Sequence, residues 1–492
     1  MQKILEVLNM INKAVAKIPG YSNPLVSHKY GADPYALVYG GRVYIYMTND
    51  TLVYDENGEV TNVNYGVINK ITVISSEDMV NWTDHGEIPV AGADGIAKWA
   101  KNSWAPAIAH KKINGKDKFF LYFANNGSGI GVLTAETPIG PWTDPLGEAM
   151  ITHDVPGIKG VWWLFDPAVL VDDDGTGYLY CGGGIPHDQK ATAEEIAHPK
   201  TARVIKLTDD MIHVDGKAIT IDPPYLFEDS GIHKYNGKYY YSYCSNFAGT
   251  HPEGAPPKGE IAYMISDNPM GPFTYVGTIL KNPAEYFGVG GNNHHAIFEF
   301  NKQWYITYHA QTLDKAIAGE GRGYRSTHIN KLEYDENGLL KEVIGDMEGI
   351  CQLKNLNPYQ RNEAETIAWN AGVSTEKFGV EDEQIDIPNL KLTGIDNGDW
   401  FAVAKADFGE NGAKSFTANI ASVKGGKIEI HLDSYDGELI GTLDIDSSDG
   451  EEKWLEMKTD VKKVTGVHDI YFVFLGEEDQ NNLFYIDYWQ FN

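Results

Sequence analysis

The amino-acid sequence predicts an all-β protein, in which a five-bladed β-propeller is followed by a β-sandwich of the jelly-roll type. Three observations predict this fold class. Five similar hairpins recur between Asp33 and Tyr308, long helical patterns are nearly absent apart from one candidate at the N-terminus, and the pattern changes after Cys351. A chain of 492 residues also exceeds what one hydrophobic core usually serves, so we expect at least two domains.

The repeating unit is a pair of short strands joined by a turn that contains glycine. In the first copy, Asp33 to Tyr39 is followed by the turn Gly40-Gly41 and by Val43 to Tyr46. The other copies begin near Ala105, Asp166, Glu228 and His294. These starts recur at intervals of roughly 60 to 70 residues, which leaves space for about four strands in each unit. Five such units in a row predict a five-bladed propeller.

The second part of the chain has a different sequence pattern. Residues 355–361 form a polar segment that contains proline, and short strand patterns such as Lys427 to Leu432 and Phe484 to Trp489 follow it. This pattern is typical of a β-sandwich. We therefore predict a catalytic propeller over residues 1–354, a linker over 355–361 and a sandwich domain over 362–492.

The formal net charge of −29 excludes two classes of partner. It repels phosphate backbones and anionic lipids, so we expect neither a nucleic-acid partner nor a membrane, whereas a neutral polysaccharide is indifferent to it. Three cysteines are too few for a disulfide framework or a zinc site. Met1 to Gly20 lacks the continuous apolar stretch of a signal peptide, which predicts a cytoplasmic protein, or a secreted one if a leader has been removed. We expect a monomer.

Residues at matching positions of the first strands in a propeller converge near its central axis. These positions carry Asp33, Ala105 with Trp104 beside it, Asp166, Glu228 and His294. Each acid alone has an ordinary explanation, as a turn cap before proline or as a solvated loop residue. Their shared register favours a catalytic set, because clustered carboxylates repel one another and give a purely structural propeller no benefit.

Glycosidic hydrolysis is the reaction that such a set can perform. It requires one protonated acid for the leaving oxygen and one ionised carboxylate for water or for covalent attack. A third carboxylate raises the pKa of the acid and orients it. Trp104, Trp162, Trp163 and, less strongly, Phe247 offer aromatic faces for stacking on a sugar, although each is also explained by ordinary packing.

The chain up to Cys351 resembles glycoside hydrolase family 43, particularly its arabinoxylan arabinofuranohydrolases and β-xylosidases. The matching motifs are Gly31 to Tyr35, Trp104 to Pro106, Phe165 to Ala168, Phe227 to Ser230 and Asn293 to Ala296. The resemblance implies that Asp33 is the general base, Glu228 the general acid, and Asp166 the residue that tunes and positions this acid. The family inverts anomeric configuration, so a water should fit between base and acid, about 6.5–9.5 Å apart.

The resemblance also gives roles to two basic residues of the propeller. From sequence alone, His294 and His295 are either a buried, hydrogen-bonded pair or ligands of an ion in the axial channel. By resemblance, His294 lies near a Ca²⁺ in the propeller axis, and Arg325 reaches toward the substrate. The predicted substrate-binding residues are therefore Trp104, Trp163, Phe247, His294 and Arg325.

The tail from about Asn362 resembles a family 6 carbohydrate-binding module. Glu363 to Glu365 and Ile486 to Trp489 match its Ca²⁺-holding strands, which implies a structural Ca²⁺ held by Glu363, Glu365 and Asp487. Tyr485 stands where these modules often carry a sugar-binding Asn. This departure leaves open whether the tail binds sugar or chiefly braces the propeller.

The favoured function is the release of α-L-arabinofuranose from arabinoxylan or its oligosaccharides. Within the enzyme class, the alternative is an exo-β-xylosidase or an enzyme with both activities, because the two sugars present similar hydroxyls. From another class, the alternative is a non-catalytic propeller that only binds carbohydrate. A sucrase or fructosidase propeller is more distant, and it would retain anomeric configuration through a covalent intermediate.

Overall fold

The computed structural model describes residues 16–378, 389–448, 452–477 and 480–492. Strands dominate these residues, and the α-helices among them are the short α2 (Ala193–Ala197), α3 (Pro283–Phe287) and α4 (Thr312–Ala318). The predicted all-β class is confirmed. The candidate helix at the N-terminus falls largely on residues 1–15, outside the described residues. Within the described ranges, no helix combines the length and the apolar character that crossing a membrane requires.

The chain divides into two compact units. The large unit comprises Tyr30–Val73 and Glu87–Gly349, and the small unit comprises Met1–Lys29, Ile74–Gly86 and Ile350–Asn492. The start of the small unit's last segment, Ile350, lies close to the predicted end of the first domain. The predicted domain limits at residues 354 and 362 stay predictions.

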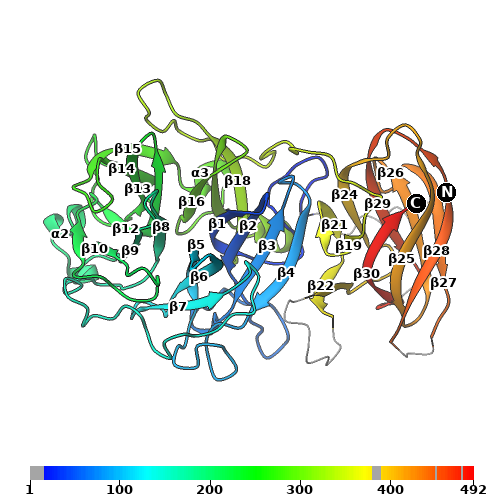
Figure 1. Ribbon diagram of the computed structural model, residues 1–492, viewed down its shortest axis with the longest axis horizontal. Helices are drawn as coiled ribbons and strands as arrows, with labels where there is room; N and C mark the ends of the chain where they lie inside the picture. The colour runs from blue at the N-terminus through cyan, green and yellow to red at the C-terminus, as the bar shows by residue number, and fades with distance from the viewer. Residues whose placement is uncertain (1–15, 379–388, 449–451, 478–479) are drawn as a thin grey trace. The chain divides into compact units, whose positions relative to one another are not determined.

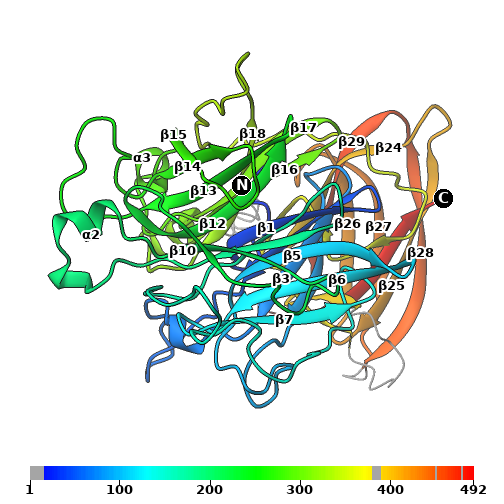
Figure 2. The same ribbon diagram turned by 60° about the vertical axis from the view of Figure 1, so that its left-hand side comes forward.

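Five sheets follow one another along the chain from Ala32 to Leu332, and each begins with a hairpin (Figure 1). Their strands are β1 (Ala32–Tyr39), β2 (Arg42–Thr48), β3 (Ile71–Ser76) and β4 (Trp82–Ile88); β5 (Trp104–Ile113), β6 (Lys116–Ala124) and β7 (Ile130–Ala135); β8 (Ala168–Val171), β9 (Gly177–Cys181), β10 (Ala202–Lys206) and β11 (Ile219–Ile221); β12 (Leu226–Tyr235), β13 (Lys238–Ser245), β14 (Ile261–Ser266) and β15 (Thr274–Leu280); and β16 (His295–Phe300), β17 (Gln303–Ala310) and β18 (Ser326–Leu332). The strands β5, β6 and β7 lie side by side in cyan in Figure 2.

Turn chemistry explains why the hairpins form where the sequence predicts them. Asn114-Gly115 and Asn236-Gly237 both have two consecutive residues with positive φ, at 53° and 80° and at 48° and 76°. This backbone suits a two-residue hairpin turn, and Asn and Gly adopt it at little cost. The strands that flank these turns pair antiparallel, with Ile113 opposite Lys116 and Tyr235 opposite Lys238.

The first strands of the five sheets contact one another in a closed succession. Strand β1 contacts β5, β5 contacts β8, β8 contacts β12, β12 contacts β16, and β16 contacts β1. The segment before β1 is also tied to the start of β18, because Gly31 N donates to the carbonyl of Arg325 at 2.9 Å and Thr327 Oγ1 donates to Gly31 O at 3.0 Å. Positions far apart in the sequence are therefore brought to one neighbourhood.

Apolar side chains fill the space between neighbouring sheets. Phe120 and Tyr122 of β6 pack with Leu179 of β9 and Ile205 of β10 in one buried core. Each such side chain contributes roughly 1.5–3 kcal/mol through removal from water. These cores fix the starts of the first strands, on which the candidate site is built.

The small unit contains two further sheets. The first consists of β22 (Ser374–Lys377), β23 (Leu390–Thr393), β30 (Phe484–Phe491), β25 (Ala413–Ser422) and β28 (Lys453–Val464), with β19 (Asn362–Glu363) beside β30. The second consists of β21 (Trp369–Ala371), β24 (Trp400–Asp407), β29 (Val467–Leu475), β26 (Gly426–Leu432) and β27 (Glu438–Ile445). The short β20 (Thr366–Ile367) pairs with β4. Phe416 and Ile486 from the first sheet share one buried core with Phe401 and Phe472 from the second.

Candidate active site

Three of the predicted mouth positions share an unusual backbone conformation. Asp33, Ala105 and Asp166 each precede a proline and have φ values of 48°, 41° and 49°. Residues other than glycine rarely adopt positive φ, and Asp tolerates it better than most. The common conformation supports the prediction that these positions are equivalent in successive sheets. It is also a strain that marks functional sites more often than ordinary strand starts.

In the fourth sheet, the backbone at the matching position, Glu228, has a different conformation. Glu228 lies in β12, where the pairing with β13 shifts register on both sides of it. The positive φ falls on the next residue, Asp229, at 68°. In a regular strand, the side chains of Glu228 and Asp229 would point to opposite faces of the sheet. The bulge removes this alternation at the two consecutive acids.

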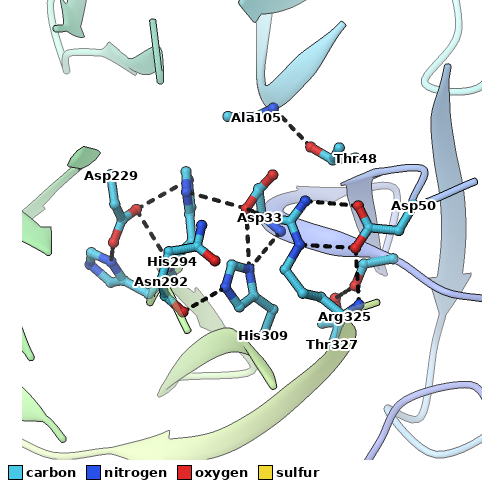
Figure 3. A network of polar contacts seen from close by, with 12 residues as sticks. Asp33, Thr48, Asp50, Ala105, Asp229, Asn292, His294, His309, Arg325 and Thr327 are labelled. Atoms are coloured by element: carbon cyan, nitrogen blue, oxygen red, sulfur yellow. Dashed lines mark hydrogen bonds and ion pairs between the residues drawn. The ribbon is translucent and has the colours of Figure 1, made fainter. Parts of the chain in front are cut away.

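Asp33 is a buried carboxylate surrounded by one guanidinium and two imidazole rings (Figure 3). Its Oδ1 lies 2.8 Å from Arg325 Nη1, 3.1 Å from His309 Nδ1 and 3.5 Å from His294 Nδ1. Burial by itself would raise the pKa of Asp33, but Arg325 and the two imidazoles hold this pKa well below its ordinary value. Asp33 is therefore ionised throughout the physiological pH range, as a general base must be.

Asp166 and Glu228 are shifted in the opposite direction. Burial, together with the carboxylates of Glu228 and Asp33, raises the pKa of Asp166 well above its ordinary value. Burial is also the main cause that raises the pKa of Glu228 to about 8; a hydrogen bond with Asn292 opposes this rise, and the charges of Asp33 and Asp229 add to it. Among the described residues, Glu228 Oε1 has no hydrogen-bond partner. One ionised carboxylate and a pair that retains a proton are the groups that acid–base catalysis needs.

Arg325 is held in place where it faces Asp33. Its Nη2 donates to Asp50 Oδ1 at 2.7 Å and its Nε donates to Asp50 Oδ2 at 2.9 Å (Figure 3). Its guanidinium carbon lies 5.3 Å from the centre of the Tyr65 ring. A two-pronged bond to one carboxylate and a contact with an aromatic ring fix the plane of the guanidinium, so its remaining Nη1 points at Asp33.

Trp163 belongs to a row of aromatic rings next to the acids. Its ring centre lies 5.5 Å from that of Phe165 and 5.7 Å from that of Phe227, the residues that directly precede Asp166 and Glu228. The Phe247 ring lies 5.7 Å from Phe227 and is 45% exposed. The row combines packed rings with an exposed one that is available to a sugar face.

Two further tryptophans flank this region. Trp104 donates from Nε1 to Tyr65 O at 3.1 Å and lies edge-on to the Tyr65 ring, 6.4 Å away. Since Tyr65 also contacts Arg325, the side chain of Trp104 is linked to Asp33 through two intermediate residues, Tyr65 and Arg325. Trp162 is 44% exposed, and its ring centre lies 6.1 Å from that of His187.

His294 lies between carboxylates rather than facing an open coordination position. Its Nδ1 is 3.5 Å from Asp33 and 3.8 Å from Asp166, and its Nε2 is 3.1 Å from Asp229. Across the described ranges, no group of three or more His, Cys, Asp or Glu side chains has the geometry of a metal site. Water or backbone oxygens would have to supply most ligands of an axial Ca²⁺. This ion stays a prediction.

The acids predicted to hold Ca²⁺ in the small unit are near one another. Arg361 binds Glu363 at 2.7 Å through Nε and reaches Asp487 Oδ1 at 3.2 Å through Nη2. Glu365 is buried, its Oε2 lacks a hydrogen-bond partner among the described residues, and burial and the neighbouring acids raise its pKa well above the ordinary value. The unpaired buried oxygen of Glu365 is chemically suited to a hard cation, but the three acids do not form a ligand group within the described residues, so this Ca²⁺ stays a prediction.

Sequence reasoning missed Asp50 and His309, and it did not assign Asp229 a role. Asp50 follows β2 and His309 lies near the end of β17, each beside the start of its sheet's first strand, because Thr48 pairs with Ala32 and Tyr308 with His295. The end of a second strand in a hairpin necessarily lies beside the start of the first strand. Reading both strands of each hairpin would have found these two residues.

Taken together, an ionised buried base, two acids that retain a proton and exposed aromatic rings beside them define a glycoside hydrolase. The model of glycosyl hydrolases family 43 matches residues 21–340, and that of the family 6 carbohydrate-binding module matches residues 363–492. The chain belongs to glycosyl hydrolases family 43 and carries a family 6 module at its C-terminal end.

Similar proteins cover almost the whole chain. An arabinoxylan arabinofuranohydrolase of Paenibacillus polymyxa is 64% identical over 98% of this chain and 76% of its own length. One of Bacillus subtilis strain 168 is 59% identical over 97% of this chain and 93% of its own length. A crystal structure of a family 43 arabinoxylan arabinofuranohydrolase from Bacillus subtilis, in complex with cellotetraose, is 58% identical, has a TM-score of 0.95, and covers 98% of this chain and 99% of that one.

Proposed function

We propose that this enzyme releases α-L-arabinofuranose from arabinoxylan and arabinoxylo-oligosaccharides. The observation that carries the proposal is the opposite pKa shifts of three neighbouring buried acids. The pKa of Asp33 is held low, and the pKa values of Asp166 and Glu228 are raised. The choice of substrate is supported by two relatives that are named arabinoxylan arabinofuranohydrolases and align along nearly the entire chain.

The acids would act in a single displacement. Asp33 takes a proton from a water, and the oxygen of this water forms a bond to the anomeric carbon of arabinose. As the bond from that carbon to the xylan oxygen breaks, Glu228 gives its proton to the leaving oxygen. Asp166 positions Glu228, whose pKa is raised mainly by burial, with added repulsion from Asp33 and Asp229. Attack by water from the opposite face inverts the configuration of the sugar.

We propose that the five sheets form the blades of a β-propeller. The closed succession of contacts from β1 through β5, β8, β12 and β16 back to β1 supports this architecture. In the small unit, the common core of two sheets with complementary inward faces supports a β-sandwich. The family 6 match, and the relative solved with cellotetraose, support binding of a polysaccharide or oligosaccharide.

We propose that the small unit holds a structural Ca²⁺. Glu363, Glu365 and Asp487 would hold it, and its charge would offset the repulsion among these three acids. Asn389 and Asn419, which donate to Asp487 at 3.1 Å and 2.9 Å, orient that carboxylate. The ion contributes stability to the unit and takes no part in the displacement.

Product analysis tests the function directly. Arabinoxylan and xylotriose are incubated with the enzyme, and free arabinose and xylose are quantified by chromatography. We expect arabinose from arabinoxylan and little xylose from either substrate. Xylose from xylotriose without arabinose from arabinoxylan would favour the β-xylosidase alternative, and any turnover excludes a propeller that only binds. NMR of the first-formed anomer separates inversion from the retention expected of a fructosidase.

A further inference from the structure

A second row of polar side chains lies in the large unit next to the catalytic acids, and the displacement does not use it. His295 Nδ1 is 2.5 Å from Asp229 Oδ2, and His295 Nε2 is 2.7 Å from Ser242 Oγ. All three side chains are buried, with exposures of 0% for Asp229 and 1% for His295 and Ser242. We refer to Asp229, His295 and Ser242 as the buried relay.

Asp229 connects this relay to the catalytic residues at three points. Its backbone N donates to Asp166 Oδ2 at 2.9 Å, its Oδ1 lies 3.1 Å from His294 Nε2, and it is covalently joined to Glu228. The positive φ of 68° is what aims the N–H at Asp166 while the carboxylate turns to the two histidines. Asp229 Oδ1 also accepts from the backbone N of His295 at 3.2 Å.

Gly231 leaves the space that the buried relay occupies. A Cβ added to Gly231 would lie 2.6 Å from Ser242 Oγ and 2.9 Å from His295 Nε2, so only glycine leaves space for this contact. Burying three polar groups costs free energy unless every one of them is bonded. Here, each has a partner at hydrogen-bond distance, and the chain of partners ends on Asp166 and His294.

We propose that Asp229 is a positioning residue that fixes Asp166 and the His294 ring relative to Glu228, with His295 and Ser242 as its supports. The proposal rests on the proposed function. Asp229 acts through Asp166 and through the backbone of Glu228, both of which serve the acid half of the reaction. Its loss should therefore weaken proton donation to the leaving group more than attack by water.

Substrates with different leaving groups separate these two halves. A xylose hydroxyl leaves only with a proton from the acid, whereas 4-nitrophenolate leaves readily without one. For Asp229→Ala, we expect kcat to fall about 100-fold on an arabinoxylo-oligosaccharide, in the range of a lost acid–base contribution. On 4-nitrophenyl α-L-arabinofuranoside, we expect a fall of less than about 10-fold, with KM within about 2-fold on both substrates. Asp229→Asn, which tolerates the same φ and keeps a hydrogen-bonding side chain, should restore most of the activity.

A matched control is available in the small unit. Asp433 also has positive φ, at 64°, and its carboxylate lies 2.9 Å from His468 Nδ1. Asp433→Ala should leave kcat on both substrates unchanged. If Asp229→Ala does not fold, Ser242→Ala carries the test, because it removes only the last bond of the relay and should show the same preference for the nitrophenyl substrate to a smaller degree.

Equal losses of kcat on the two substrates, or no loss on either, would overturn the positioning role. So would a loss for Asp229→Asn as deep as that for Asp229→Ala. Failure of the proposed function is distinguishable, because a wild-type enzyme that cleaves xylosides but not arabinofuranosides would show it before any variant is made. The same comparison of leaving groups would then be run with xylotriose and 4-nitrophenyl β-D-xyloside.

Discussion

Arg325 donates a 2.8 Å hydrogen bond from Nη1 to Oδ1 of Asp33, a residue 292 positions earlier in the chain. Asp50 binds the other side of the same guanidinium, so Arg325 is shared by two buried carboxylates. A cation placed in this way stabilises the ionised form of Asp33 without being free to leave it. The contact accounts for a buried Asp that stays charged, which its burial alone would prevent.

Arg325→Met removes this charge while retaining the apolar stem. We expect kcat/KM to fall about 100-fold or more, because the base then binds a proton at higher pH. The acidic limb of the kcat/KM profile should move to higher pH, because the pKa of Asp33 rises when Arg325 is lost. Arg322→Met is the control, since Arg322 has a similar pair with Asp314, 2.6 Å away. An acidic limb that stays in place in Arg325→Met would argue against Asp33 as the base.

The basic limb of the wild-type profile should reflect Glu228. Its pKa is raised to about 8, so the acid is protonated at neutral pH and loses its proton as the pH passes through that value. Activity on an arabinoxylo-oligosaccharide should therefore decline in the mildly alkaline range rather than near pH 5. Initial rates across pH 4 to about 10 at low substrate concentration measure this limb. Loss of activity already near the ordinary pKa of Glu would contradict the assignment.

Glu228→Gln preserves the shape of the side chain but cannot give up a proton. We expect kcat on arabinoxylo-oligosaccharides to fall about 10²- to 10⁴-fold, with KM largely unchanged. Glu299→Gln, at an exposed position of β16, serves as the control and should behave like the wild type. Circular dichroism and the unfolding midpoint establish that both variants fold. Substantial turnover of oligosaccharide by a folded Glu228→Gln would remove Glu228 from the mechanism.

Calcium should stabilise the protein through the small unit. Glu365 is buried with an unpaired oxygen, and Ca²⁺ that binds only the folded state at 100 times its Kd adds about 2.7 kcal/mol. We expect CaCl2 to raise the unfolding midpoint of EDTA-treated protein and Glu365→Gln to abolish this response. Glu429→Gln, which removes a partner of Lys427 instead, should keep the response. Identical midpoints with CaCl2 and with EDTA would exclude the structural ion.

Sequence reasoning identified the three candidate acids but not all of their partners. Asp33, Asp166 and Glu228 could be predicted because hairpin turns and strand patterns are local signals that recur with each sheet. Arg325 was accessible only through the family resemblance, and Asp50 and His309 were missed. Their roles depend on which side chain they meet across the fold, and no local pattern encodes this choice.

The same distinction applies to the fold. The strand patterns at Lys427 to Leu432 and Phe484 to Trp489 correspond to β26 and β30. That β30 lies between β23 and β25 was not predictable, because pairing between strands distant in sequence has no short-range signature. Likewise, the bulge that turns out both Glu228 and Asp229 arises from the register of β12 against β13.

The bonds between Gly31 and the Arg325–Thr327 segment have a consequence for biosynthesis. A nascent chain on the ribosome can make its early hairpins one by one, but Asp33 meets its cation only after the polypeptide has emerged beyond β18. Until then, Gly31 lacks its hydrogen-bond partners on Arg325 and Thr327, and the large unit is incompletely folded. Asp33 therefore gains its cation late in synthesis, and a protein truncated before Arg325 should be inactive rather than partly active.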